Sequence, residues 1–139
     1  MRFMMLVKAS QDSETGRLPS SEELGAMGKF NEELVKSGIL LAGEGLHPSS
    51  KGARVTFSNK QTQVTDGPFA ETKELVAGFW IIEVKSMEEA IAWARRVPFT
   101  DGEIEIRRVF APEDFAPSDP TGEHRAHEAR LRAQAETKS

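Results

Sequence analysis

The sequence predicts a single α+β domain in which two strand–helix–strand units flank an inserted β-hairpin. Residues 1–9 and residues 78–85 each carry apolar side chains on both faces of an expected strand, which is typical of a strand covered on both sides. A stripe of apolar residues at helical spacing follows each strand and opens with the pattern Ser-x-x-Glu. Residues 53–65, between the two units, alternate as a hairpin does.

The first strand has two apolar faces. One face carries Phe3, Met5 and Val7, and the other carries Met4 and Leu6. Residues 10–18 are polar and are expected to form a loop. A short apolar run at residues 39–42 predicts the second strand of this unit.

The helix between these strands has a defined start and end. Ser20 and Glu23 stand at capping-box spacing, and Gly38 suits the left-handed residue that ends many helices. The expected buried stripe consists of Leu24, Met27, Phe30 and Leu34.

The hairpin and the second strand–helix–strand unit are predicted from the same kinds of residue pattern. Residues 53–58 and 61–65 are expected to pair through a turn at Asn59-Lys60.

The strand at 78–85 places Phe79 and Ile81 on one face and Trp80, Ile82 and Val84 on the other. In the helix that follows, Ser86 and Glu89 stand at capping-box spacing, and Pro98 ends the helix. Its expected buried stripe consists of Met87, Ala90, Ile91, Ala94 and Val97. Residues 103–110 alternate charged and apolar side chains, which favours an exposed edge strand.

This order of elements is that of a ferredoxin-like split βαβ arrangement with an inserted hairpin. Two helices cover only one face of the resulting sheet, although both faces are apolar. A second copy of the chain is the economical cover for the open face, so we expect a homodimer.

The chain divides at about residue 115. We expect residues 1–115 to form the domain and residues 116–139 to form a charged C-terminal tail. Residues 123–136 have good helix propensity but little to bury, so we expect a helix that docks weakly on its own domain or on a partner subunit. Its expected contact side consists of Ala126, Ala129, Ala133 and Leu131.

Composition limits the kinds of function. The chain has no cysteine, which excludes disulfides and thiolate metal sites and favours a reducing compartment. The net charge is −4 and acidic and basic residues are interspersed, so the sequence shows no basic patch for binding nucleic acid. No apolar run is long enough to span a bilayer. The start of the chain lacks the apolar region of a signal peptide, and no cofactor motif is present. We therefore expect a cytoplasmic protein without a cofactor and without nucleic-acid or membrane partners.

Residues 66–74, Asp-Gly-Pro-Phe-Ala-Glu-Thr-Lys-Glu, resemble the motif of the DGPF subgroup of YCII-related proteins. The sequences at residues 30–34, 41–46 and 78–80 agree with this resemblance, which covers about residues 1–111. It implies a ferredoxin-like, dimeric α/β-barrel fold and no established activity. Subgroup members are often encoded beside extracytoplasmic-function sigma factors, which implies a regulatory context.

One departure from the family pattern limits what the resemblance carries over. Smaller YCII-related proteins are proposed to use a histidine in the first helix with an aspartate near the end of that helix. Here the helix contains no histidine and ends in Val35-Lys36-Ser37. That pair is absent, so any acid and base must come from other positions.

Asp66 and His47 are the candidate catalytic residues. Asp66 precedes Gly67-Pro68, where its carboxylate either stabilises a turn or faces a cleft at a strand end. His47 is the only histidine before the tail, and histidine is the residue type that most often acts as acid or base in catalysis, although the position is equally compatible with a loop residue without a role.

Three further residues are candidate ligand-binding groups. Glu44 lies between Gly43 and Gly45, a pattern that allows close approach of the backbone. Arg54 either contacts a ligand or pairs with Asp66 across the hairpin. Lys73 could recognise an anionic or polar ligand, although charged loop residues are usually only solvated. The spacing of His124 and His127 permits a metal pair, but no other ligand lies near, so no metal site is predicted.

Two functional hypotheses remain open. The first is a cofactor-independent enzyme that performs acid–base chemistry on a small molecule in a dimer cleft. The second is a non-catalytic sensor of a small ligand, or a partner-binding protein, in a sigma-factor-linked regulatory context.

Overall fold

The computed structural model describes residues 1–137. The chain folds as two compact units, which divide between Arg108 and Val109. The first unit contains β1 (Arg2–Lys8), α1 (Gln11–Glu14), α2 (Ser21–Lys36), β2 (Leu40–Gly45), η1 (Ser49–Lys51), β3 (Ala53–Ser58), β4 (Gln61–Asp66), η2 (Thr72–Glu74), β5 (Val76–Glu83), α3 (Met87–Ala94) and β6 (Ile104–Arg108). The second unit contains η3 (Pro112–Ser118) and α4 (Glu123–Glu136).

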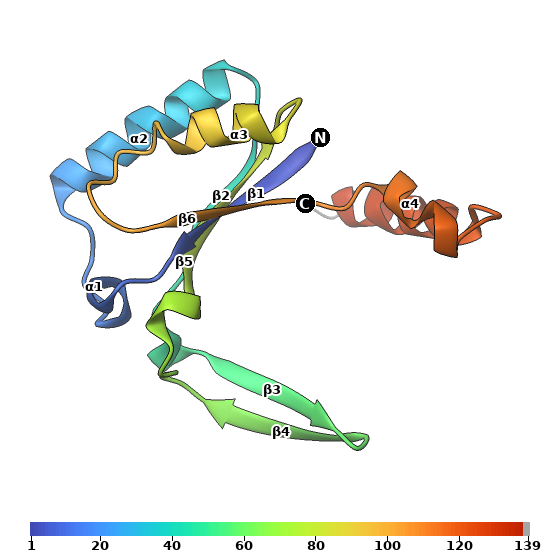
Figure 1. The fold of residues 1–139 in the computed structure, drawn as a ribbon, viewed down its shortest axis with the longest axis horizontal. Coiled ribbons are helices and arrows are strands. Elements are labelled where there is room, and N and C mark those ends of the chain that lie inside the picture. The colour runs from blue at the N-terminus through green and yellow to red at the C-terminus, as the bar shows by residue number, and fades with distance from the viewer. Residues whose placement is uncertain (138–139) are drawn as a thin grey trace. The chain divides into compact units, whose positions relative to one another are not determined.

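The first unit is built on a four-stranded sheet in the order β2-β5-β1-β6 (Figure 1). Every neighbouring pair of strands is antiparallel. The sheet does not close into a barrel, and β3 and β4 form a separate antiparallel pair. The predicted α+β class is therefore confirmed, with β6 as the expected edge strand.

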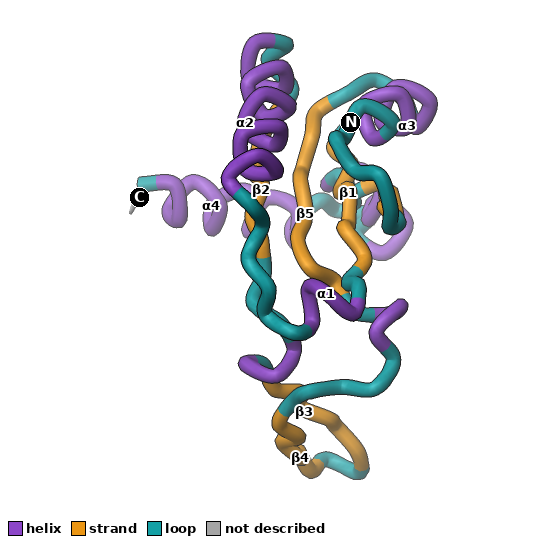
Figure 2. The backbone as a smooth tube through the Cα atoms, turned by 90° about the vertical axis from the view of Figure 1, so that its left-hand side faces the viewer, coloured by secondary structure: helices purple, strands orange, loops and turns teal. Residues whose placement is uncertain are grey.

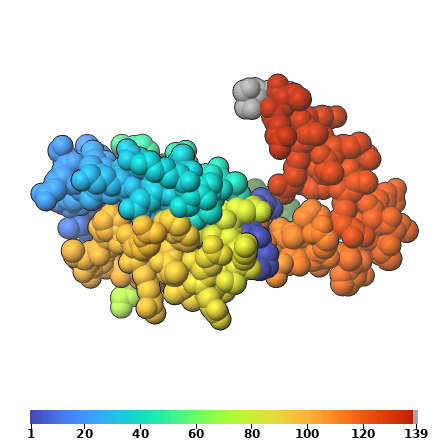
Figure 3. All heavy atoms as spheres, turned by 90° about the horizontal axis from the view of Figure 1, so that it is seen from above, coloured from blue at the N-terminus to red at the C-terminus, as the bar shows by residue number. Residues whose placement is uncertain are grey.

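The core lies between one face of the sheet and the helices α2 and α3, which lie side by side (Figure 3). Phe3, Met5 and Ile82 contribute fully buried side chains from the sheet, and Leu34 and Ala90 contribute them from the helices. The two-faced strands are as predicted, since Met4, Leu6, Phe79 and Ile81 lie on the other face, where they are half-buried.

Trp80 links the sheet to α2. Its indole N–H donates to Oδ1 of Asn31 at 2.9 Å, and its ring meets Phe30 edge to face at 5.5 Å. Gly43 lies beside it, where a Cβ would stand 2.9 Å from the indole ring. These contacts explain why small and aromatic residues stand at these positions of the sequence.

The helices depart from the predicted stripes at several positions. Leu24 is 59% exposed, and Met87 and Ile91 are about 40% exposed. In α3 the half-buried Trp93 instead packs against Phe30, with ring centroids 6.4 Å apart. The buried side of α3 therefore faces α2 as well as the sheet.

The capping devices are largely as predicted. Ser20 and Glu23 form a complete capping box, and Gly38 has a φ of +73° after the end of α2. At α3 the hydroxyl of Ser86 accepts from Glu89 N–H, whereas the carboxylate of Glu89 accepts from Lys85 N–H instead of Ser86. The two helix starts are therefore similar but not identical.

The expected loop at residues 10–18 contains a short helix, α1. Ser10 and Ser13 each accept a hydrogen bond from the other's backbone N–H, at 3.1 and 2.9 Å. This reciprocal capping closes one turn of helix that no apolar pattern predicts. Figure 2 shows α1 beyond the end of β1.

The predicted tail helix is present as α4, within the second unit. None of its residues is buried, and Leu131 is 45% exposed. That this helix docks weakly on its own domain or on a partner subunit stays a prediction. Within residues 1–137, no helix is both long enough and apolar enough to cross a membrane.

Candidate functional site

A cavity of about 500 Å³ lies at the end of β1, and we call it the α1 cavity. Three parts of the first unit line most of it: residues 7–13, residues 17–23 and the loop at 98–103 that joins α3 to β6. Its wall combines apolar groups such as Phe99 with hydroxyl and charged side chains. A pocket with an apolar wall and a few polar groups is the usual form of a small-molecule site.

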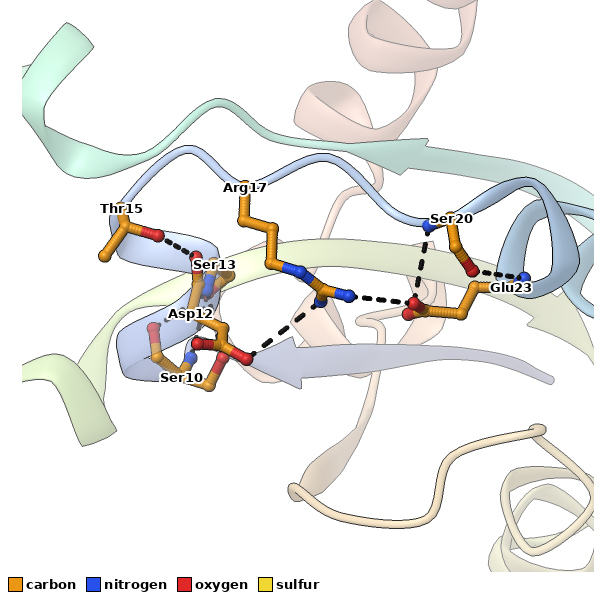
Figure 4. Close-up of polar contacts among 7 residues, drawn as sticks. All are labelled: Ser10, Asp12, Ser13, Thr15, Arg17, Ser20 and Glu23. Carbon is orange, nitrogen blue, oxygen red and sulfur yellow. Dashed lines mark hydrogen bonds and ion pairs between the residues drawn. The ribbon is translucent and has the colours of Figure 1, made fainter.

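Arg17 holds two parts of this wall together (Figure 4). Its guanidinium lies 3.2 Å from Glu23 Oε1 at the start of α2 and 4.0 Å from Asp12 Oδ2 in α1. Both contacts are partly exposed to solvent, so each adds little to stability by itself. The arginine thus lies between two carboxylates, one from α1 and one from α2.

Glu23 is also part of the helix cap. Its carboxylate accepts from Ser20 N–H at 3.3 Å, and the Ser20 hydroxyl accepts from Glu23 N–H at 3.1 Å. The hydrogen bonds of Ser20, together with the positive charge of Arg17, hold the pKa of Glu23 below its ordinary value. Glu23 is therefore an ionised anchor rather than a proton donor near neutral pH.

The charged groups of the wall are unevenly paired. Four acidic and two basic residues line the α1 cavity: Asp12, Glu23, Asp101 and Glu103, with Lys8 and Arg17. Lys8 Nζ lies 3.7 Å from Glu105, so both basic side chains already have carboxylate partners. Within residues 1–137, neither Asp101 nor Glu103 forms an ion pair.

The Asp-Gly-Pro-Phe turn at residues 66–69 lies at the root of the hairpin. Gly67 N–H donates to Gly52 O at 3.0 Å, and Phe69 N–H donates to the Ser49 hydroxyl at 3.2 Å. A Cβ on Gly67 would stand only 1.7 Å from the Ser49 carbonyl oxygen. The glycine thus allows close approach of two backbone segments of the chain itself.

The model of the YCII-related domain matches residues 1–115 of this chain. The chain belongs to the YCII-related family. An uncharacterised protein of Rhizobium meliloti (strain 1021) is 46% identical to it over 50 residues. That match covers 36% of this chain and 40% of the Rhizobium protein, so the chain spans less than half the length of this relative.

None of the five site residues predicted for this YCII-related chain lines the α1 cavity. All five are exposed. Glu44 lies in β2 opposite Phe79, His47 follows β2, Arg54 lies in β3, Asp66 ends β4 and Lys73 lies in η2. They come from residues 44–73, whereas the cavity is lined mainly by residues 7–23 and 98–103.

The structure does not join Asp66 to the other candidates. Strand register pairs Asp66 with Ala53 and Arg54 with Thr65, so the two charged side chains lie on opposite faces of the hairpin. The interpretation of an Arg54–Asp66 pair is therefore wrong, and the Arg54 guanidinium instead lies 3.8 Å from the centre of the Phe69 ring. Among residues 1–137, no hydrogen bond or ion pair links Asp66 to His47.

The sequence gives little signal for the residues of the α1 cavity. Glu23 is recognisable as a cap, but Arg17 stands in a polar loop without a motif. Asp101 and Glu103 belong to a different strand–helix–strand unit, and only the sheet order brings them near α1. No group of three or more histidine, aspartate or glutamate side chains in the described part of the chain is arranged to hold a metal ion.

Proposed function

We propose that this YCII-related protein binds a small, positively charged organic molecule in the α1 cavity, without catalysing its conversion. The observation that carries the proposal is the uneven pairing of charges in the wall. Both basic side chains are held by carboxylates, whereas Asp101 and Glu103 stay available as acceptors. An amine or similar cation complements such a wall, and Phe99 and Pro98 offer contact for its apolar part.

We favour the sensor hypothesis over the enzyme hypothesis on chemical grounds. An acid–base enzyme needs two groups that can exchange protons within reach of one substrate. Glu23 is kept ionised by its cap, and within residues 1–137 no hydrogen bond or ion pair joins Asp66 to His47. Catalysis by Asp66 and His47 in a dimer cleft stays a prediction.

Fragment binding tests the proposal directly. Ligand-observed NMR with butylamine, butyrate and butanol compares three probes of similar shape and different charge. We expect butylamine to bind and the other two not to bind. Asp101→Asn together with Glu103→Gln should weaken butylamine binding, because the acceptors lose their charge. The matched control is Asp66→Asn, an exposed carboxylate outside the cavity, which should leave binding unchanged.

A thermal-shift screen of a metabolite library then separates the two hypotheses. Ligands that stabilise the wild type but not the cavity variant, and that are recovered unchanged, support the sensor. Ligands that stabilise the wild type but not Asp66→Ala, or that are chemically converted, support instead the enzyme hypothesis with a site at the hairpin root. Preferential binding of butyrate over butylamine would contradict the charge argument.

The proposal includes a homodimer of the dimeric α/β-barrel type. Antiparallel strands in the order β2-β5-β1-β6, with α2 and α3 on one face, suit a ferredoxin-like fold. The open face carries Met4, Leu6, Phe79 and Ile81, which a second sheet would cover. Sedimentation should give twice the chain mass of 15.4 kDa, and a monomer at micromolar concentration would contradict this part.

Two finer assignments belong to the same proposal. Membership of the DGPF subgroup is supported by residues 66–74, whose Gly67 meets a specific packing demand. A regulatory role in the cytoplasm fits a ligand-binding protein without cysteine. Fractionation of cells that produce the tagged protein tests the location.

A further inference from the structure

The hairpin of β3 and β4 presents an exposed apolar face. Val55 pairs with Val64 across the hairpin, so their side chains share one face, which Phe57 extends toward the turn. These three side chains are 52%, 64% and 77% exposed. Every residue of both strands is exposed, so this apolar face has no covering layer in the first unit.

The root of the hairpin is nevertheless firmly held. Besides the backbone bond between Gly67 and Gly52, Phe69 packs under Arg54 and donates to Ser49. Glu14 of α1 in turn accepts two hydrogen bonds from Ser49. The hairpin is therefore an arm fixed at its base, and an isolated two-stranded hairpin needs a packing partner to be stable in water.

The direction of the arm indicates which partner covers it. Figure 1 shows β3 and β4 running out on the side of the sheet away from α2 and α3. This is the side of the open apolar face. A strand of six residues spans about 20 Å, whereas stacked sheets lie about 10 Å apart. An arm on this side thus reaches past the sheet of a second copy stacked on the open face.

We propose that the hairpin is a clasp that grips the second copy of this chain, through the face formed by Val55, Phe57 and Val64. This inference rests on the homodimer proposed above and adds a second contact to it. In a two-fold dimer each copy gives one arm and receives one, so both apolar surfaces are covered at once. Phe57, near the tip, carries the largest part of the contact.

Dilution experiments test the clasp with the full-length chain. Analytical ultracentrifugation of Phe57→Ser should show a dimer dissociation constant at least about tenfold higher than that of the wild type, since an aromatic anchor is lost. Thr56→Ala is the matched control, because Thr56 lies on the other face of the same strand. Phe57 is 77% exposed, so its replacement should not impair folding of the chain.

Cross-linking identifies what the arm touches. The chain has no cysteine, so Ser58→Cys provides a single site for a benzophenone maleimide at the tip. Equal amounts of ¹⁴N- and ¹⁵N-labelled protein are mixed before illumination. We expect cross-linked peptides that join the two labels, which shows contact between copies.

The outcomes distinguish the clasp from the dimer. A wild-type protein that sediments as a monomer overturns both proposals. A wild-type dimer with an unchanged dissociation constant in Phe57→Ser, and with cross-links only within one chain, overturns the clasp and leaves the sheet-to-sheet dimer standing. Cross-links only to another cellular protein, when the labelled protein is illuminated in a cell extract, assign the arm to a different partner and also overturn the clasp.

Discussion

Glu14 in α1 and Ser49 in η1 are joined by two hydrogen bonds across 35 positions of the sequence. Ser49 N–H donates to Glu14 Oε2 at 2.9 Å, and the Ser49 hydroxyl donates to Oε1. The same hydroxyl accepts from Phe69 N–H. Because α1 also lines the cavity, one short helix contacts both the candidate ligand site and the root of the hairpin.

Acid should weaken this link. The hydroxyl of Ser49, and then its backbone N–H, hold the pKa of Glu14 below its ordinary value of 4.5. A carboxyl with a lowered pKa in the folded state stabilises the protein above its unfolded pKa, and that contribution is lost as the pH falls through the folded pKa. We expect Glu14→Gln to be less stable than the wild type at neutral pH, with a difference that shrinks below about pH 4.5.

Urea unfolding across this pH range measures the effect. Ser49→Ala is the partner variant, since it removes the hydroxyl that donates to Glu14 and leaves the carboxylate. Because the same hydroxyl also accepts from Phe69 N–H, Ser49→Ala has a cost of its own, and the pair is tested by the double variant, whose loss of stability should be smaller than the sum of the two single losses. A constant difference between wild type and Glu14→Gln at every pH would contradict the assignment.

Gly67→Ala should destabilise the chain by about 2 kcal/mol or more, because the new methyl group would overlap the Ser49 carbonyl. The matched control is Gly28→Ala in α2, where a Cβ would meet nothing within 4 Å. That change should stabilise the helix by about 0.5–1 kcal/mol. Thermal unfolding of both variants measures the contrast. Equal melting temperatures would show that the backbone at the hairpin root accommodates the methyl group with little loss of stability.

Much of the fold follows from local pattern. The two-faced strands, the caps at Ser20 and Ser86 and the hairpin turn at residues 59–60 each depend on neighbours within a few positions, and sequence alone predicts them. By contrast, α1 depends on two serines that cap each other without any apolar stripe. Its formation was not predictable from hydrophobic periodicity.

The candidate site depends on contacts that sequence does not encode locally. Arg17 acquires its role because Asp12 and Glu23 converge on it, and Asp101 joins them only through the order of the strands. The motif at residues 66–74 drew attention to Asp66, yet the observed contacts belong to Gly67 and Phe69. The motif therefore includes residues, such as Gly67, whose type is required for packing at the hairpin root.

Asn31→Leu should destabilise the core. The change leaves the indole N–H of Trp80, a residue that is only 6% exposed, without its acceptor. An unsatisfied buried donor costs about 1–3 kcal/mol. Urea unfolding followed by tryptophan fluorescence measures the loss, and Glu32→Ala at the exposed neighbouring position should change stability by less than about 0.5 kcal/mol.

The last prediction concerns the start of α4. Asp119 is only 4% exposed, and its carboxylate accepts from the backbone N–H groups of His124 and Arg125 and from the Arg125 guanidinium. Arg125 Nη2 also donates to the Asp119 carbonyl at 2.8 Å. Burial alone would raise the pKa of Asp119, but the hydrogen bonds from Arg125 and His124 outweigh it and lower the pKa.

Asp119→Ala should therefore unwind the first turns of α4, because this helix has almost no buried surface to hold it otherwise. Chemical shifts of residues 123–136 measure the loss, while the melting temperature of residues 1–108 should stay the same.

Truncation after Ala116 should likewise preserve the fold and the proposed dimer. Acid should imitate Asp119→Ala, since a carboxyl with a lowered folded-state pKa loses its contribution as the pH falls through that pKa. Glu128→Gln, which breaks only the exposed pair with Arg132, is the control and should leave α4 helical, so equal unwinding in both variants would contradict the role of Asp119.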